Sequence, residues 1–214
     1  LCLNKHNDGI KLFPGGDTMK KSSLIVLAGG KSSRMKTNKA FLPINNTSLI
    51  ETIINKLSNQ FQQVIVVSND IPSYSHLKAK IVPDIIPNCG PLSGIHAGLV
   101  KSNYSLSFVV ACDMPFVSIN LANHLISLAN GFDVVVPIVK ENYEALCAVY
   151  AKSCIPDIEN NLEKGKRKVS SLYKQVKTLP VYEKELSKHC RVDQAFLNLN
   201  TPHDYRMAQR LLNA

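Results

Sequence analysis

Short apolar runs and amphipathic stretches alternate along the chain from about residue 20 onward. Residues 24–28 and 106–111 are almost unbroken apolar runs, which is typical of strands buried on both faces of a parallel sheet. Ser48 and Glu51 form a capping box before an apolar stripe, which predicts a helix over 48–57. Similar patterns predict strands at 64–67, 81–82, 134–136, 145–151, 176–181 and 196–197, and helices at 91–99, 121–129 and 155–163. The alternation predicts an α/β fold in a single domain: a Rossmann-like, mostly parallel sheet with helices on both faces.

The two ends of the chain carry different patterns. Residues 1–18 contain Pro14, Gly15 and Gly16 without a sustained apolar period, so we expect an N-terminal extension there, with disorder as one expectation, and the folded domain over 19–214. The beginning also lacks the basic and apolar regions of a secretory signal. Near the other end, Thr201 is placed to cap a final helix that starts at Pro202, with Asp204 three residues after the cap.

Composition narrows the classes of function. A net charge of +9 and a pI near 9.3 favour an anionic partner, although solubility alone would account for part of the charge. No recognition-helix, RNA-binding or zinc-finger motif accompanies the basic residues, so a small acidic substrate is favoured over nucleic acid. The six cysteines lack zinc or redox spacing, which indicates reduced thiols and a cytoplasmic location. No apolar run is long enough for a membrane span.

The loop after the first predicted strand has the composition of a phosphate-binding turn. Gly29 and Gly30 allow the backbone to approach a ligand closely, and Arg34 and Lys39 add positive charge. Ligands of open α/β sheets bind outside the carboxyl ends of the strands. Many strand-to-helix loops contain two glycines, so this feature alone is not decisive. Neither the P-loop motif nor the dinucleotide-binding motif is present.

Further polar residues follow other predicted strands. Asp113 comes directly after the strand at 106–111 and precedes a proline, so its carboxylate should lie at the same edge as the Gly-Gly turn. Mg²⁺ binds through one or two carboxylates plus substrate phosphates. Asp84, Gly90 and Asn69 form a second group that could contact a ribose or base. Ordinary turn and capping roles remain the alternatives for all of these residues.

In this order, the segments resemble the molybdenum cofactor guanylyltransferases, which belong to the Rossmann-like nucleotidyltransferases. The resemblance runs from about Lys21 to the C-terminus. The segments that carry it are LAGGKSSRM at 27–35 with Lys39, PD at 83–84, GPLSGI at 90–95, CDMPF at 112–116, YEALCAVY at 143–150 and NLNTPHD at 198–204.

The resemblance implies a Mg²⁺-dependent enzyme that transfers GMP from GTP to the phosphate of molybdopterin and releases pyrophosphate. Molybdoenzyme apoproteins or other cofactor-biosynthesis proteins would be further partners. It implies nucleoside contacts at Leu27, Ala28, Gly29, Asn69, Asp84 and Gly90, phosphate contacts at Gly30 and Lys39, a metal ligand at Asp113, a pterin side at Arg34, Lys168, Asn198 and Asn200, and catalysis by Lys39, Arg34 and Asp113.

The chain departs from the family pattern at a few positions. Lys36 and Asn38 stand where the family usually has Gly and often has Asp, and Lys168 ends a segment where two arginines are expected. No Ser/His/Asp triad is needed for an anionic nucleophile, and His96 and His203 are interpreted as helix-surface residues. Three alternatives therefore stay open: a cytidylyltransferase for molybdopterin, one for a sugar phosphate, or a non-catalytic nucleotide-binding module.

Overall fold

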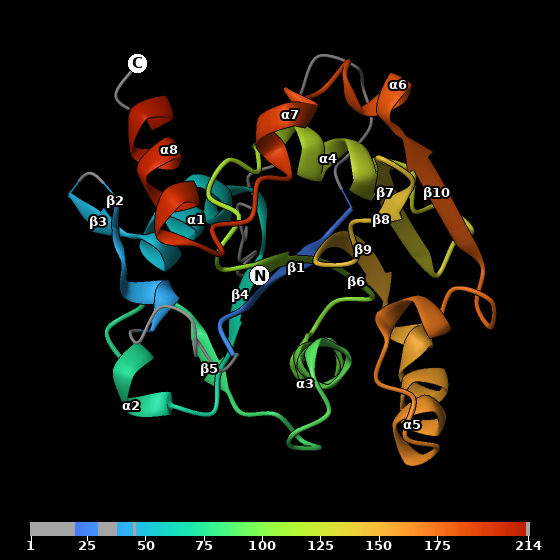
Figure 1. Ribbon diagram of the computed structural model, residues 1–214. Helices are drawn as coiled ribbons and strands as arrows, with labels where there is room; N and C mark the ends of the chain where they lie inside the picture. Colours follow the sequence, from blue (N-terminus) through green and yellow to red (C-terminus); the bar gives the residue numbers. More distant parts are fainter. Residues whose placement is uncertain (1–19, 30–37, 45, 213–214) are drawn as a thin grey trace, which may run out of the picture.

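The computed structural model describes residues 20–29, 38–44 and 46–212, and within them eight strands form one mixed sheet (Figure 1). The strands of this sheet are β1 (Ser22–Leu27), β4 (Gln63–Val67), β5 (Lys80–Val82), β6 (Leu106–Ala111), β7 (Val134–Val139), β8 (Asn142–Tyr143), β9 (Cys147–Ala151) and β10 (Thr178–Tyr182). Their order is β10-β7-β9-β6-β1-β4-β5, and β8 pairs with β7. Two short strands, β2 (Pro43–Ile44) and β3 (Thr47–Ser48), pair separately.

Strand direction confirms the predicted, mostly parallel α/β architecture. β1 pairs in parallel with β4 and β6, β4 with β5, and β7 with β10. β9 runs antiparallel to both β6 and β7, and the short β8 runs antiparallel to β7. The chain passes from β1 to β4 and β5 on one side and then crosses to β6 on the other. The switch point of the topology therefore lies between β1 and β6, where ligands of open α/β sheets bind.

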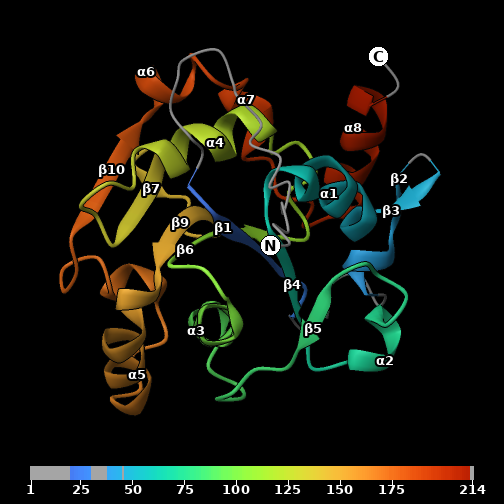
Figure 2. The same cartoon turned by 180° about the vertical axis from the view of Figure 1, so that it is seen from behind.

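Helices cover both faces of the sheet, as predicted (Figures 1 and 2). Leu24 and Val26 of β1 belong to the core on the side of α1 and α4, whereas Ile25 and Leu27 face α3 and α5. The helices are α1 (Leu49–Leu57), α2 (Ile71–Tyr74), α3 (Pro91–Lys101), α4 (Ile119–Ser127), α5 (Ile155–Glu163), α6 (Glu183–Leu186), α7 (Val192–Ala195) and α8 (Pro202–Leu212). None of the helices in these residues is long and apolar enough to cross a membrane.

Both predicted helix starts are confirmed by reciprocal hydrogen bonds. The Ser48 amide donates to Glu51 Oε2 (2.8 Å) and the Glu51 amide to Ser48 Oγ (3.4 Å). At α8, the Thr201 amide donates to Asp204 Oδ2 (2.8 Å) and the Asp204 amide to Thr201 Oγ1 (3.2 Å). Each arrangement satisfies backbone N–H groups that the first helical turn leaves without carbonyl partners.

Two sequence-based predictions are wrong. Residues 196–197 are not a strand, because α7 precedes them and both side chains pack into apolar clusters instead of pairing. His96 is not on the helix surface: it is 2% exposed, and its Nε2 lies 2.9 Å from Glu159 Oε1 of α5. The reason is that α3 is covered by the sheet on one side and by α5 on another, which buries residues 92–99. His203, by contrast, has a side chain that is 72% exposed, as expected.

Gly98 shows how closely α3 approaches the sheet. A Cβ atom at this position would lie 2.6 Å from Cγ2 of Ile25, a residue that is itself fully buried. A larger residue at this position would force the buried Ile25 side chain, β1 or α3 to shift. The close approach fixes the second half of α3 against the middle of β1.

Candidate active site

Gly29 and Asp113 leave the sheet at the same edge. Leu27 of β1 and Ala111 of β6 are paired residues, and Gly29 and Asp113 each follow them by two positions. The Cys112 amide donates to the Leu27 carbonyl (3.0 Å), and the Ala28 amide donates to the Val67 carbonyl (3.0 Å). These bonds extend the pairing beyond the strand ends. Two predicted site residues, Gly30 and Arg34, lie outside the described residues.

Three segments that are distant in sequence meet around Lys39. Its Nζ lies 3.9 Å from Asp113 Oδ2 and donates a hydrogen bond to Asn200 Oδ1 (2.8 Å). The Leu199 amide donates to the Asp113 carbonyl (3.0 Å), which holds the C-terminal segment against the end of β6. Asn200 was expected on the pterin side, yet it contacts the lysine expected to bind triphosphate. Asn198 is half-buried beside it, with its Nδ2 3.4 Å from the Phe196 carbonyl.

The electrostatics of Asp113 favour a cation. Its side chain is 20% exposed, and burial raises the pKa of the carboxyl group, an effect that nearby Lys39 opposes. The lysine is too distant for a hydrogen bond to this carboxylate, so its compensation of the buried charge is partial. A hard divalent cation would supply the missing charge. A carboxylate such as that of Asp113 could hold Mg²⁺, which takes most of its other ligands from phosphates and water.

The Tyr74 hydroxyl joins Ala28 to Asn38, two residues on either side of positions 30–37. No pattern in the sequence predicted this role. Its hydroxyl donates to the Ala28 carbonyl (3.1 Å) and accepts from Asn38 Nδ2 (2.9 Å). The residue is fully buried, and its ring packs on Phe41 with centroids 4.8 Å apart. Burial raises the pKa of Tyr74, so the hydroxyl stays protonated near neutral pH. Asn38, one of the departures from the family pattern, therefore has a defined structural partner.

Asn69 and Asp84 form a closed pair at the ends of β4 and β5. Asn69 Nδ2 donates to Asp84 Oδ2 (3.0 Å), and the Asp84 amide donates to Asn69 Oδ1 (2.9 Å). The pair lies beside the first turn of α3, because a Cβ atom at Gly94 would be 3.8 Å from Asp84 Oδ1 and 3.1 Å from Leu27 Cδ2. Gly90 caps this helix with a φ of +71°, a conformation that favours glycine.

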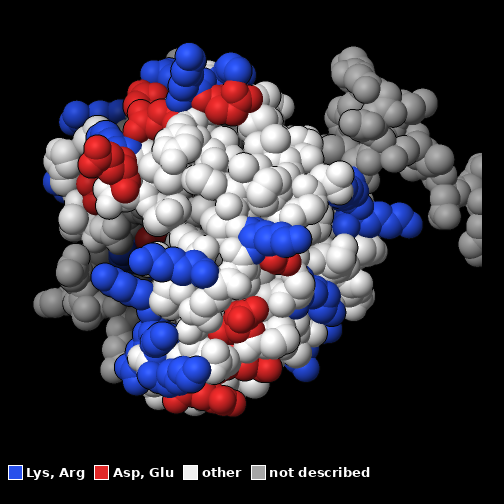
Figure 3. Space-filling model, turned by 90° about the vertical axis from the view of Figure 1, so that its right-hand side faces the viewer, with Lys and Arg blue, Asp and Glu red and all other residues white. Residues whose placement is uncertain are grey.

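Lys168 belongs to a different part of the surface. It lines an open pocket of about 480 Å³ together with Arg167, Tyr143 of β8 and Pro91, the residue after Gly90. The pocket therefore links the start of α3 to the basic segment before Val169–Ser171. On the side of the molecule that carries α5 and β10, basic side chains lie in separate groups with acidic ones among them (Figure 3). This face lacks the continuous basic stripe typical of a nucleic-acid-binding surface.

Comparisons with known proteins agree with the fold and the motifs. The MobA-like NTP transferase domain matches residues 24–179. A probable molybdenum cofactor guanylyltransferase of Pelotomaculum thermopropionicum is 38% identical over 186 residues, covering 87% of this chain and 91% of the relative. Another probable molybdenum cofactor guanylyltransferase, from Peptoclostridium acidaminophilum, is 36% identical over 209 residues, covering 94% of this chain and 91% of the relative.

A solved structure supports the same conclusion. Molybdopterin-guanine dinucleotide biosynthesis protein A from Archaeoglobus fulgidus is 28% identical and superposes with a TM-score of 0.79, covering 89% of this chain and 98% of that protein. The sequence motifs, the sheet topology and the relatives agree, and the chain belongs to the MobA-like NTP transferase domain family.

Proposed function

We propose that this nucleotidyltransferase moves GMP from GTP onto the terminal phosphate of molybdopterin, with Mg²⁺ as its cofactor. The observation that carries the proposal is the meeting of Lys39, Asp113 and Asn200 at the switch point of the sheet. Relatives that share more than a third of their aligned residues with this chain are named as molybdenum cofactor guanylyltransferases. Lys39 and Asp113, together with the Gly-Gly pair in the sequence, suit a polyphosphate substrate.

In the proposed reaction, a phosphate oxygen of molybdopterin attacks the α-phosphorus of GTP in line with the bond to pyrophosphate. The new P–O bond forms as the bond to the leaving group breaks, and pyrophosphate carries away the electron pair. The nucleophile is already anionic, so no protein base is needed to activate it. Bound Mg²⁺ would neutralise charge on the phosphates and stabilise the departing pyrophosphate.

The protein contributes positioning and fixed charge. Lys39 neutralises phosphate oxygens, and its hydrogen bond to Asn200 holds the ammonium group in place. Asp113 would hold the metal, and the backbone at Ala28 and Gly29 would lie close to the nucleoside. The two hydrogen bonds between Asn69 and Asp84 hold these side chains in place on the nucleoside side of the proposed site. Holding reactants in line in this way lowers the activation barrier without a covalent intermediate.

The pocket that Lys168 lines is the proposed acceptor site. Its volume of about 480 Å³ lies within the usual range for small-molecule pockets. Lys168 and Arg167 offer two cations for the acceptor phosphate, and the exposed ring of Tyr143 offers an apolar surface for a flat heterocycle. Pro91 connects this pocket to the nucleoside wall at Gly90.

The decisive experiment is incubation of the protein with GTP labelled at the α-phosphate, Mg²⁺ and molybdopterin. We expect a labelled dinucleotide and one pyrophosphate per product. Asp113→Asn keeps the shape of the side chain but removes its charge, so product formation should fall by at least about 100-fold. The matched control is Asp193→Asn, at a carboxylate that is 69% exposed on α7, which should retain activity.

Other outcomes distinguish the alternatives. Product from CTP in place of GTP would identify a cytidylyltransferase. Product formed with a sugar phosphate would identify the sugar phosphate as the acceptor in place of molybdopterin. GTP binding without turnover would favour a non-catalytic nucleotide-binding module. Full activity of Asp113→Asn would refute the metal assignment.

A further inference from the structure

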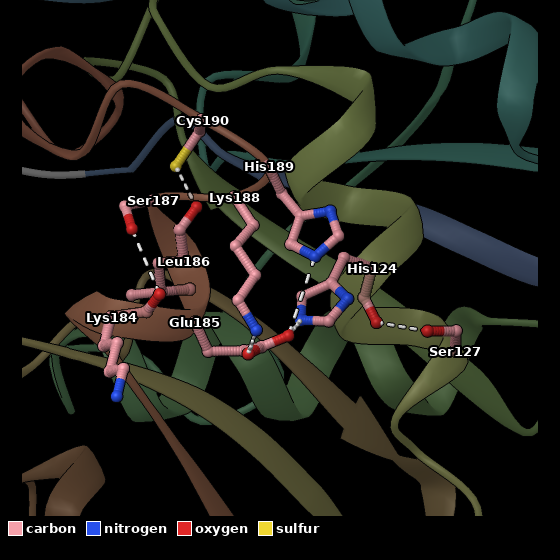
Figure 4. A network of polar contacts seen from close by, with 9 residues as sticks. All are labelled: His124, Ser127, Lys184, Glu185, Leu186, Ser187, Lys188, His189 and Cys190. Atoms are coloured by element: carbon pink, nitrogen blue, oxygen red, sulfur yellow. Dashed lines mark hydrogen bonds and ion pairs between the residues drawn. The ribbon is translucent and has the colours of Figure 1, made fainter.

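Two histidines and a glutamate meet on the side of the sheet that carries α4 (Figure 4). His124 belongs to α4, Glu185 to α6, and His189 follows α6. Their potential ligand atoms all lie within 4.8 Å of one another. None of these residues belongs to the nucleotide or acceptor sites described above.

The distances within this cluster resemble those between ligands that share a metal. Glu185 Oε1 lies 3.6 Å from His124 Nε2 and 3.8 Å from His189 Nε2. Both distances are too long for good hydrogen bonds. In a tetrahedral zinc site with bonds of about 2.0–2.1 Å, neighbouring ligand atoms are about 3.3 Å apart. The two carboxylate–imidazole distances exceed that spacing by only a few tenths of an ångström.

His124 supplies a second, independent observation. Its Nε2 atom is buried, yet it has no hydrogen-bond partner among the residues that the structure describes. Buried polar atoms are satisfied in the great majority of cases, and an orphaned one destabilises the fold. A metal ion placed between this nitrogen and Glu185 would satisfy it.

The two oxygens of the Glu185 carboxylate have different partners. Lys188 contacts Oε2, which leaves Oε1 to face both imidazoles (Figure 4).

One adjustment accompanies metal binding. The two imidazole rings are stacked, with centroids 3.7 Å apart and planes inclined by 14°, whereas a metal lies close to the plane of each ring that ligates it. The side chain of His189 is 32% exposed and has room to turn, while that of His124 is 11% exposed and stays fixed. Lys188, 60% exposed, can move away from the incoming cation.

We propose that His124, Glu185 and His189 form a binding site for a divalent transition metal of the zinc type. Two imidazoles and one carboxylate are a recurrent donor set for Zn²⁺, and they disfavour Mg²⁺, which prefers oxygen ligands. The ion would join α4 to the segment that continues through α7 to Asn200. The site is independent of the proposed transferase reaction, because its test requires no substrate.

The test is metal titration of the 214-residue chain after removal of bound metals with a chelator. Zn²⁺ is titrated in competition with a chromogenic chelator, and Co²⁺ is followed by its visible absorption. We expect saturable binding of one ion per chain at micromolar concentration. Loss of outer-shell partners already costs about 10–100-fold in metal affinity, so His189→Ala and Glu185→Gln should each weaken binding at least tenfold.

Thermal unfolding gives a second readout. At a metal concentration about 100 times the Kd, Zn²⁺ should raise the unfolding midpoint by up to about 5–10 °C. The rise should vanish in the double variant His124→Gln with His189→Ala and persist in His203→Ala, a histidine exposed on α8. Circular dichroism checks that each variant folds, and His189→Ala alone serves if the double variant does not. Absence of one-to-one binding, or binding unchanged by His189→Ala and Glu185→Gln, overturns the proposal.

Discussion

Replacement of Tyr74 by Phe tests whether its hydroxyl holds Ala28 and Asn38 together. The variant keeps the buried ring and its packing on Phe41 but removes the hydroxyl that joins the Ala28 carbonyl to Asn38. Asn38 is exposed and can turn to water, whereas Tyr74 is fully buried and water cannot replace its hydroxyl without rearrangement. The principal loss is therefore the hydrogen bond to the Ala28 carbonyl.

The magnitude follows from that one bond. A buried acceptor left without its donor costs about 1–3 kcal/mol in the free energy of unfolding. For a domain of this size, each kcal/mol lowers the unfolding midpoint by about 2–4 °C, so we expect a decrease of about 2–12 °C. If about half of a 3 kcal/mol loss is expressed in the position of Ala28 and Gly29, GTP binding weakens by about tenfold.

Thermal unfolding at pH 7 and the Kd for GTP measure the two effects separately. Tyr182→Phe is the matched control, because Tyr182 is 60% exposed and removal of its hydroxyl should change stability by less than about 0.5 kcal/mol. Equal midpoints for the two variants would refute the structural role of the hydroxyl. A destabilised Tyr74→Phe variant with unchanged GTP affinity would refute the link between Tyr74 and the nucleotide site.

Two further predictions concern packing and pH. Gly98→Ala should lower the free energy of unfolding by up to about 2 kcal/mol, because overpacking against buried Ile25 costs up to about 3 kcal/mol and the gain in helix propensity is only about 1 kcal/mol. Urea unfolding measures this loss. The control is Lys101→Ala, at an exposed position of the same helix, and equal stability of the two variants would contradict the prediction. Burial raises the pKa of Asp113, so a proton competes with Mg²⁺ at higher pH than at an ordinary aspartate. The Mg²⁺ concentration for half-maximal activity should therefore rise as pH falls through this raised pKa, while the metal-free fold gains stability over the same range; a Mg²⁺ requirement independent of acidification would contradict this sign.

Much of the fold could be predicted because the relevant interactions are local or periodic. The capping residues Ser48 and Thr201 find their partners three positions away, so both helix starts are visible in the sequence. The apolar runs of β1 and β6 identify strands buried on both faces. Since parallel strands end at a common edge, the sequence also predicted that Asp113 would leave the sheet beside Gly29.

The parts that could not be predicted depend on contacts between distant segments. Tyr74 lies in a short helix with no local pattern that marks its hydroxyl as a link to Ala28. Lys39 and Asn200 are separated by 161 positions, and contacts such as the hydrogen bond from the Leu199 amide to the Asp113 carbonyl bring their segments together. His96 looked exposed because its contact with α5 is invisible in the pattern of α3. The antiparallel direction of β9 was likewise hidden, because an apolar run carries no information about direction.

The C-terminal segment, which is hydrogen-bonded to Asp113 after β6, contributes a residue to the candidate site from outside the matched family domain. The matched family domain ends at residue 179, yet Asn200, which holds the Lys39 ammonium group, lies beyond it. A chain shortened after α7 would retain every strand of the large sheet and lose this support. On the proposed function, we expect substitutions in the C-terminal segment to alter turnover through Lys39 while residues 27–35 stay unchanged.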